Sequence, residues 1–398
     1  MEKIGVGYAY VSDAEKRYVN EALDAGRLSQ GKMVHKFEKE FARLHDQKYG
    51  VACNSGTSAL HVCLEAMKEV YRWADDSEVL VPAITFIATS NACIHAGLKP
   101  VFVDVDPISY NMDAPKMEAR ITDKTVAAIP VHTFGQPCEM DAIMAVAEKH
   151  GLRILEDCAE AHFATYKDKK IGSFGDMAAF STYVAHTITT GIGGVITTNN
   201  LVLTEISRSL IAHGRACTCE TCLASDPRQV CKLRMQTEMD KRFMMVRMGY
   251  SYRIGELEGA LGLGQLENRD LIMNTRKENA HYLTEGLQGV EQYLQLPTYP
   301  DYVDHSFMMY PLVIKKDAPF TRDEFTHFLE KNNIETRPML PLLNQPVYKK
   351  LFGDIESDYP VAEWLDHYGL YVGCHHGLSK EQLDKIVATI KEFLQDKA

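Results

Sequence analysis

The 398-residue sequence lacks the features that would place it in a specialised class of protein. It has no hydrophobic run of the roughly 20 residues that a membrane-spanning helix needs, and its N-terminus, MEKIGVGYAYVSDAEK, has no apolar core of an export signal. It has no basic run, and a formal net charge of -11 disfavours nonspecific nucleic-acid binding. These absences predict a cytoplasmic protein with neither a nucleic-acid nor a membrane partner.

The composition is that of an ordinary globular protein. Hydrophobic residues make up 45% of the chain and charged residues 24%, and the length suits one large domain plus a smaller one. Ten cysteines in a chain without an export signal belong in a reducing compartment, so we do not expect disulfides.

Lysine is also missing between Lys170 and Lys232, and this absence bears on the chemistry. Within that stretch, Phe180–Thr198 reads FSTYVAHTITTGIGGVITT, which predicts a strand, a tight polar turn and a second strand. The segment resembles F-S-x-x-x-x-K-x-x-T-T-G-E-G-G of the DegT-type nucleotide-sugar aminotransferases, which are fold-type I pyridoxal-phosphate enzymes. His186 stands at the position of the cofactor-binding lysine, and Ile192 at that of the glutamate.

The histidine changes the chemistry that this segment can perform. A covalent link to the cofactor's aldehyde needs a primary amine, which imidazole does not have. With an ordinary pKa of about 6.5, histidine is well suited to moving protons near neutral pH. The same exchange marks the 3-dehydratases of this family, which act on nucleotide-linked 4-keto-6-deoxyhexoses. The resemblance therefore implies C3 dehydration with pyridoxamine phosphate (PMP), with His186 as the catalytic base.

The resemblance covers nearly the whole chain and agrees with its strand pattern. It implies a large cofactor-binding domain over residues 1–253 and a small C-terminal α/β domain over residues 254–398. Strand-like segments alternate with helix-forming sequence, which predicts a mainly parallel sheet covered on both faces. These segments are Glu78–Pro82, Pro100–Asp106, Val126–His132 and Arg153–Asp157.

A strand over residues 50–53 runs into a turn and a helix, and its backbone N–H groups at Gly56 and Thr57 suit phosphate. Taken alone, this turn favours an ordinary helix cap, but its place before the other family motifs favours phosphate binding. The family resemblance implies that Ser181 also contacts the cofactor's phosphate. It further implies that Phe86 stacks on the pyridine ring, with a core phenylalanine as the alternative.

The sequence EDCAEAH is similar to the family motif E-D-x-A-Q-A-H. By this resemblance Asp157 pairs with the protonated pyridine nitrogen, which lets the ring absorb electrons. Glu160 takes the place of a cofactor-contacting glutamine, and His162 is expected to be structural. Two acids at a strand end can also bind magnesium, and that alternative remains open.

Three further residues are assigned by resemblance. The sequence GYSYR is similar to the family's G-Y-N-Y-R, in which the asparagine reaches the phosphate of the partner subunit's cofactor. Ser251 takes that place, and a serine hydroxyl can still donate. Arg253 and Arg337 are expected to contact a nucleotide-sugar substrate, and the shared site implies a homodimer.

Cysteines are concentrated in the polar segment 213–232, with the spacing C-x-C-x2-C-x8-C. Thiolates that converge in a loop suit iron–sulfur clusters or zinc. Cys158, beside the proposed cofactor aspartate, is a fifth candidate. The ligand candidates are Cys158, Cys217, Cys219, Cys222 and Cys231.

The segment has the position of the cluster-binding loop in the iron–sulfur-containing 3-dehydrases of the family. This implies a 2Fe–2S cluster that receives electrons from a ferredoxin or a flavin/iron–sulfur reductase, while a 4Fe–4S cluster and zinc remain open. The four ligands are then Cys158 with Cys217, Cys219 and Cys231, or a local set in which Cys222 replaces Cys158.

Three other functions remain open from the sequence. The first is a 3-dehydratase whose cofactor is recharged by glutamate, without a redox cluster. The second is an ordinary pyridoxal-phosphate (PLP) sugar aminotransferase, which His186 disfavours. The third is a non-catalytic metal-binding scaffold, which the departures at Ile192 and Ser251 favour.

Overall fold

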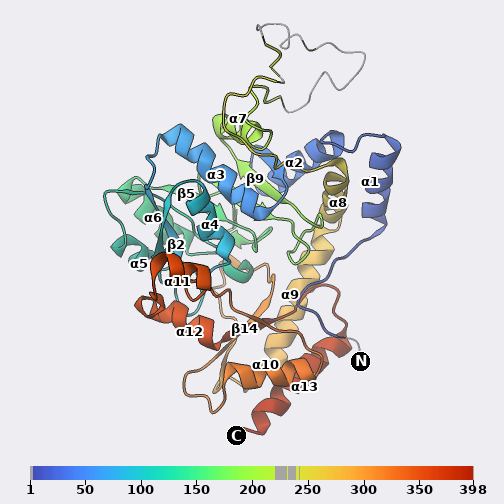
Figure 1. Cartoon of the computed structure of the whole chain (residues 1–398). Coiled ribbons are helices and arrows are strands. Elements are labelled where there is room, and N and C mark those ends of the chain that lie inside the picture. The colour runs from blue at the N-terminus through green and yellow to red at the C-terminus, as the bar shows by residue number, and fades with distance from the viewer. Residues whose placement is uncertain (1–2, 220–230, 232–238, 242, 398) are drawn as a thin grey trace.

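The structure is a computed structural model that describes residues 3–219, 231, 239–241 and 243–397 (Figure 1). Its largest element is a seven-stranded sheet in the order β1-β9-β8-β5-β4-β2-β3. The strands are β1 (Tyr49–Cys53), β2 (Glu78–Pro82), β3 (Lys99–Val103), β4 (Thr125–Ala128), β5 (Arg153–Asp157), β8 (Met177–Ser181) and β9 (Gly194–Thr198). All neighbours pair in parallel except β9, which runs antiparallel to β1 and β8. The predicted mainly parallel sheet is confirmed.

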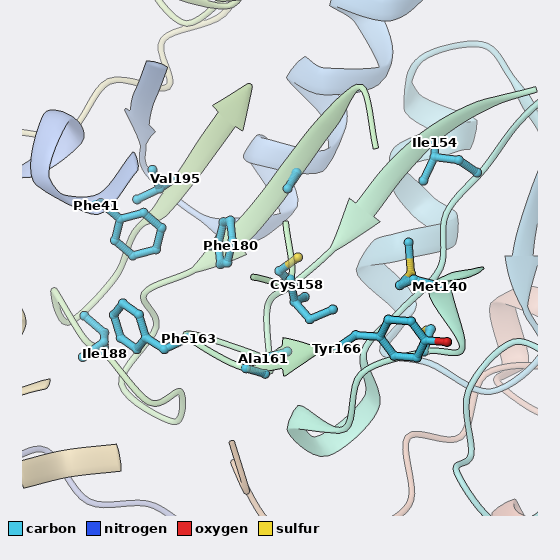
Figure 2. Close-up of a cluster of buried hydrophobic side chains, with 14 of the residues drawn as sticks. Phe41, Met140, Ile154, Cys158, Ala161, Phe163, Tyr166, Phe180, Ile188 and Val195 are labelled. Carbon is cyan, nitrogen blue, oxygen red and sulfur yellow. The ribbon is translucent and has the colours of Figure 1, made fainter. Parts of the chain in front are cut away.

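Helices cover both faces of this sheet, because successive strand residues point to opposite sides. On one face the core includes side chains of α3 (Gly56–Tyr71), α4 (Ile87–His95) and α7 (Leu201–Leu210). On the other it includes side chains of α2 (Lys32–Leu44), α5 (Ala114–Ala119), α6 (Met140–His150) and α8 (Glu256–Glu267). Figure 2 shows part of the second cluster, with Phe41, Phe163 and Phe180 among its members.

A second, smaller sheet has the antiparallel order β10-β12-β14-β13. Its strands are β10 (Leu294–Gln295), β12 (Tyr310–Ile314), β13 (Arg337–Pro338) and β14 (Gly369–Val372). The helices in this part of the chain are α9 (Arg269–Gly286), α10 (Arg322–Lys331), α11 (Pro346–Phe352), α12 (Pro360–Tyr368) and α13 (Lys380–Gln395). The expected smaller C-terminal α/β unit is therefore present.

The division at residue 253 stays a prediction, because elements after it contact elements before it. α8 packs on α1 (Asp13–Asp24) and on α2. β11 (Val303–Asp304) pairs with β6 (Thr165–Tyr166), which in turn pairs with β7 (Lys169–Lys170). Ile4 also bridges to Ile334, so the N-terminal residues lie against the smaller unit.

Local sequence signals set the ends of several helices. A capping box opens α1, where the side chains of Ser12 and Glu15 each accept the other residue's backbone N–H. The boxes at Thr321 with Glu324 and at Ser379 with Gln382 open α10 and α13 in the same way. No helix among the described residues is both long and apolar enough to cross a membrane.

The core contains a neutral histidine. His45 is fully buried, its Nδ1 lies 2.9 Å from the carbonyl oxygen of Phe41, and its Nε2 accepts from the Phe163 N–H at 3.3 Å. This arrangement requires Nδ1 to carry the proton and leaves no acceptor for a second one. Burial, more than any charge, lowers the pKa of His45 to about 3.

This histidine makes folding acid-sensitive. Its folded pKa lies below the unfolded value of about 6.5, so its contribution is present above pH 6.5 and is lost as pH falls toward about 3. We expect this residue alone to cost about 2 kcal/mol of unfolding free energy between pH 7 and pH 5. Urea unfolding of His45→Gln, which can replace both hydrogen bonds without titrating, should show a weaker pH dependence. The same substitution at exposed His327 is the control, and an equal slope in His45→Gln and the unaltered chain would contradict the prediction.

Candidate functional site

The turn between β1 and α3 lies directly against the ends of β8 and β9. Ser55 caps α3 by accepting from the Ser58 N–H. A Cβ on Gly56 would lie 2.7 Å from the Cβ of Ser181, and a Cβ on Gly194 would lie 2.8 Å from the Gly56 nitrogen. The close approach therefore requires glycine at both positions. It places the N-terminus of a 16-residue helix beside the Ser181 hydroxyl, an arrangement that suits a phosphate group.

A buried carboxylate lies at the end of β5. Asp157 accepts from the Thr89 hydroxyl at 2.8 Å and from the Ala159 N–H at 3.1 Å. Burial raises its pKa more than these hydrogen bonds lower it. Such a group gains from a buried cationic partner, which a protonated pyridine nitrogen would provide.

An exposed aromatic ring precedes Thr89 on the same helix. Phe86 is the N-cap residue of α4 and is 62% exposed, so the alternative of a core phenylalanine is wrong. The hydrogen bond from Thr89 to Asp157 anchors the first turn of α4 to the end of β5. An aromatic ring, a buried carboxylate and a phosphate-binding turn match the three parts of PLP or PMP, so these residues fit the cofactor.

Glu160 is buried, and its Oε2 accepts from the Phe134 N–H at 2.5 Å. Burial is the main cause that raises its pKa to about 7, and the charge of Asp157 adds to the shift.

His162 is completely buried among aromatic rings that include Phe41 and Phe180, and neither ring nitrogen has a hydrogen-bond partner. This placement agrees with the expected structural role of His162.

His186 lies in the turn that joins β8 to β9. Its backbone N–H donates to the Tyr183 carbonyl at 2.9 Å, and the hydroxyl oxygens of Thr182 and Thr190 lie 2.7 Å apart across the turn. A Cβ on Gly193 would collide with both of these hydroxyls, so glycine is required there. The imidazole is half-buried, and its Nδ1 is buried with no hydrogen-bond partner.

The protonation state of His186 follows from its surroundings. Burial, and secondarily the charge of Arg276, lowers the pKa of His186 to about 4. The ring is therefore neutral at pH 7 and has a lone pair that can accept a proton.

The other residues assigned by resemblance lie on loops and on the smaller sheet. Ser251 is exposed and bridges to Ala212, while the neighbouring Tyr252 carbonyl accepts from the Asn54 N–H at 2.7 Å. Burial, aided by Arg215, lowers the pKa of Arg253.

Arg337, in β13, is exposed and pairs with Glu335. The expected contacts of Ser251 with a partner's cofactor, and of Arg253 and Arg337 with substrate, stay predictions.

The structure does not bring Cys158 to the loop cysteines. Cys158 is completely buried in the cluster of Figure 2, to which Ala161 and Phe180 also belong. Among the described residues, the one set of metal-ligating groups whose ligand atoms lie within 4.8 Å of one another is His132, Glu156 and Cys158. The expected four-cysteine set with Cys158, Cys217, Cys219 and Cys231 is therefore not assembled, because Cys158 faces the sheet core. The local set includes Cys222, which lies outside the described residues.

Most polar atoms of the His132 group bond to the protein itself. His132 Nδ1 accepts from the Cys138 N–H at 3.0 Å, so Nε2 carries the ring proton and faces a Glu156 oxygen at 3.4 Å. The carboxylate of Glu156 accepts the backbone N–H groups of Gly172, Phe174 and Gly175. These contacts indicate a structural network, in which the buried Nε2 of His132 is left without a hydrogen bond.

Sequence reasoning missed two residues that the structure places around the site. Thr89 anchors α4 to Asp157, and its position one helical turn after Phe86 could have indicated it. Arg276, on α9 far along the chain, is second to burial among the causes that lower the pKa of His186, and no local pattern marks it.

The fold is that of the pyridoxal-phosphate-dependent aminotransferases, as in the aminotransferase of Psychrobacter cryohalolentis, with a TM-score of 0.87 at 27% identity over 99% of each chain. The chain belongs to the DegT/DnrJ/EryC1/StrS aminotransferase family, whose pattern matches residues 10–391. The family identified from the sequence is thus confirmed.

Its relatives include enzymes named as perosamine synthases and enzymes named as 3-dehydratases. It is 35% identical to GDP-perosamine synthase of Caulobacter vibrioides, over 99% of each chain. It is 32% identical to dTDP-4-dehydro-2,6-dideoxy-D-glucose 3-dehydratase of Saccharopolyspora spinosa, over 94% of this chain and 83% of the other. The solved structure of Escherichia coli GDP-4-keto-6-deoxy-D-mannose-3-dehydratase with bound hydrated PLP superposes with a TM-score of 0.86, at 26% identity over 98% of this chain and 100% of the other.

The exposed ring of Phe86 offers a clean test of cofactor stacking. Because it is not part of the core, Phe86→Ala should fold normally and raise the dissociation constant for PMP about 2- to 10-fold. Titration of the purified chain with PMP, followed by cofactor absorbance, measures the change. Ile94→Ala, which removes an exposed side chain from the same helix, is the matched control. Equal affinity in Phe86→Ala and the control would refute stacking.

Proposed function

We propose that this chain is a PMP-dependent 3-dehydratase that removes the C3 hydroxyl of a nucleotide-linked 4-keto-6-deoxyhexose. The observation that carries the proposal is the imidazole of His186 in the turn between β8 and β9, where the family's aminotransferases hold a lysine. Imidazole has no primary amine, so this turn cannot tether the cofactor. What it can do there is accept and return a proton.

The residues around the turn suit that chemistry. When bound, the cofactor supplies an amine that joins the C4 ketone and a ring that absorbs electrons. Gly56, Thr57 and Ser181 would hold its phosphate, Phe86 would cover its ring, and Asp157 would keep its nitrogen protonated. Glu160, whose pKa is raised to about 7, would contact the ring edge in the place of the family's glutamine.

His186 would perform the proton transfers of the dehydration. Its neutral ring accepts a proton next to the bound cofactor and then returns it to the departing C3 hydroxyl, which leaves as water. One residue can act as base and then as acid when both positions lie within its reach.

A sugar aminotransferase is the second candidate, and the name of the relative at 35% identity supports it. That function would require another amine to bind PLP. Borohydride reduction of the PLP-loaded chain, followed by peptide mass spectrometry, separates the two functions. A modified lysine in the unaltered chain would favour the aminotransferase and would contradict the dehydratase.

Variants at position 186 test the proposed base. We expect His186→Asn to keep PMP affinity and to lose about 10²- to 10⁴-fold in dehydration rate, because the proton acceptor is gone. In PLP-loaded His186→Lys, borohydride should instead fix PLP covalently to residue 186. Loss of the hydroxyl is followed by mass spectrometry on GDP- and dTDP-linked 4-keto-6-deoxyhexoses, with His327→Asn as the exposed control. Undiminished dehydration by His186→Asn would refute the role.

A cluster bound by the cysteine-rich segment would pass on the two electrons that complete deoxygenation, which a ferredoxin or a flavin/iron–sulfur reductase would supply. We expect anaerobic purification to yield iron and sulfide, with two irons per chain for a 2Fe–2S cluster. Because Cys158 lies in the sheet core, Cys158→Ser should retain the metal, whereas Cys217→Ser should lose it. Loss of the metal in Cys158→Ser would instead support the ligand set in which Cys158 is one of the four cysteines. Zinc alone, or no metal, would favour the glutamate-recharged dehydratase, whose turnover depends on glutamate and not on a reductase.

A further inference from the structure

A buried glutamine joins two helices to the turn that carries His186. Gln265, on α8, is only 2% exposed. Its side-chain oxygen accepts from the Thr189 N–H at 3.3 Å, and its nitrogen donates to the Tyr10 carbonyl and to the Glu15 carboxylate, each at 2.7 Å. One amide group therefore bonds three segments that lie far from it in the sequence, which are the His186 turn, the N-terminal segment and α1.

The side of Gln265 that faces α1 is firmly held. Glu15 is 1% exposed, and its carboxylate also accepts from the Ser12 N–H at 2.7 Å and from the Asn268 side-chain amide at 3.3 Å. A Cβ on Gly264 would lie 2.6 Å from the Cα of Glu15, so α1 and α8 are in direct contact there. The amide of Gln265 thus extends from a closely packed pair of helices toward the turn.

On the side of the turn, the contact with Gln265 has no substitute. Among the residues that the structure describes, it is the one hydrogen bond that joins residues 186–189 to a segment outside the turn between β8 and β9. The Thr189 hydroxyl bonds the Thr182 carbonyl within the turn at 3.2 Å, and the Thr187 hydroxyl is buried without a partner. A buried backbone N–H without an acceptor is costly, so loss of the Gln265 oxygen would favour another conformation of the turn.

The N-terminal segment contacts both ends of the stretch that holds His186. A Cβ on Gly7 would lie 3.6 Å from the Cα of Ala185, the residue before His186. Three residues further along, the Tyr10 carbonyl bonds the amide that holds Thr189. The backbone around His186 is therefore bounded on one side by a direct contact and on the other by a hydrogen bond.

We propose that Gln265 is a positioning residue that fixes the His186 turn in the conformation from which the imidazole reaches the reacting atoms. This inference rests on the proposed role of His186 as the catalytic base. A base transfers a proton only within hydrogen-bond reach, and a displacement of about 1 Å can lower a rate about 100-fold. The side chain of Gln265 is buried and bonded within the protein, so it acts only through the turn.

Two variants of Gln265 remove the contact in different ways. Gln265→Met has a similar shape but forms none of the three hydrogen bonds. Gln265→Lys keeps donors for the Tyr10 carbonyl and the Glu15 carboxylate but offers no acceptor to the Thr189 N–H, so it tests the proposal even if Gln265→Met does not fold. Asn268→Ala is the matched control, because Asn268 bonds Glu15 at the same helix contact without bonding the turn.

The first measurement follows His186 without substrate. The ring is labelled with carbon-13 at Cε1, and its NMR signal is assigned by its absence in His186→Asn. We expect the signal to shift or broaden in Gln265→Met and Gln265→Lys, because the turn leaves its single conformation, and to stay in place in Asn268→Ala. The proposal is overturned if either folded Gln265 variant gives the signal of the unaltered chain, or if Asn268→Ala moves the signal as far.

The second measurement separates positioning from binding. Gln265→Lys should lower kcat for dehydration about 10- to 100-fold and leave the dissociation constant for PMP within about 2-fold, because the groups proposed to hold PMP lie outside the turn. In the His186→Asn background the same substitution should cost nothing further, because its effect passes through His186. A further loss in that background, or an equal loss of PMP affinity, would overturn the proposal.

The two measurements distinguish a failure of this inference from a failure of the proposed function. Undiminished dehydration in His186→Asn would remove the proposed function, while the NMR signal, which needs no substrate, would still decide whether Gln265 fixes the turn. An unmoved signal would remove only the role of Gln265.

Discussion

The contact between two turns of the large sheet is the constraint on which the rest of the site depends. The β1–α3 turn and the ends of β8 and β9 approach so closely that a side chain at Gly56 or Gly194 would not fit. This contact places a helix N-terminus, the Ser181 hydroxyl and the His186 turn at one edge of the sheet. Asp157 reaches the same edge because β5 is the parallel neighbour of β8. Ligand sites at this edge are general in parallel sheets of this kind.

Much of this arrangement was predictable from the sequence, because short-range signals carry it. The alternation of apolar strands with helices predicted the parallel sheet, and β2 and β5 have the predicted bounds. Two other strands end earlier than predicted: β3 ends at Val103 and β4 at Ala128. Apolar character alone extends past a strand end wherever the following loop is also buried, as it is at Val131 and His132.

The parts that the sequence could not predict depend on contacts between distant segments. Arg276 resembles any helical arginine in the sequence, and only folding shows that it is buried without a carboxylate. Cys158 resembled a ligand because it adjoins Asp157, but strand geometry turns neighbouring side chains to opposite faces. The side chain of Cys158 therefore belongs to the sheet core, while the carboxylate of Asp157 bonds Thr89 on α4.

Sequence identity over the whole chain and the residue at position 186 favour different reactions. The first measures similarity of the scaffold, and the second measures the chemistry at the cofactor. Identity of 35% over 99% of the chain to a GDP-perosamine synthase reflects several hundred residues that build the scaffold. The reaction depends on the few groups that touch the cofactor, and one fold can support several reactions through such groups. A lysine can both tether the cofactor and move protons, whereas a histidine can only do the second. The exchange at His186 therefore weighs more in the assignment of the reaction than the similarity of the surrounding scaffold, and burial, which lowers the pKa of His186 to about 4, suits that histidine to act as a neutral base.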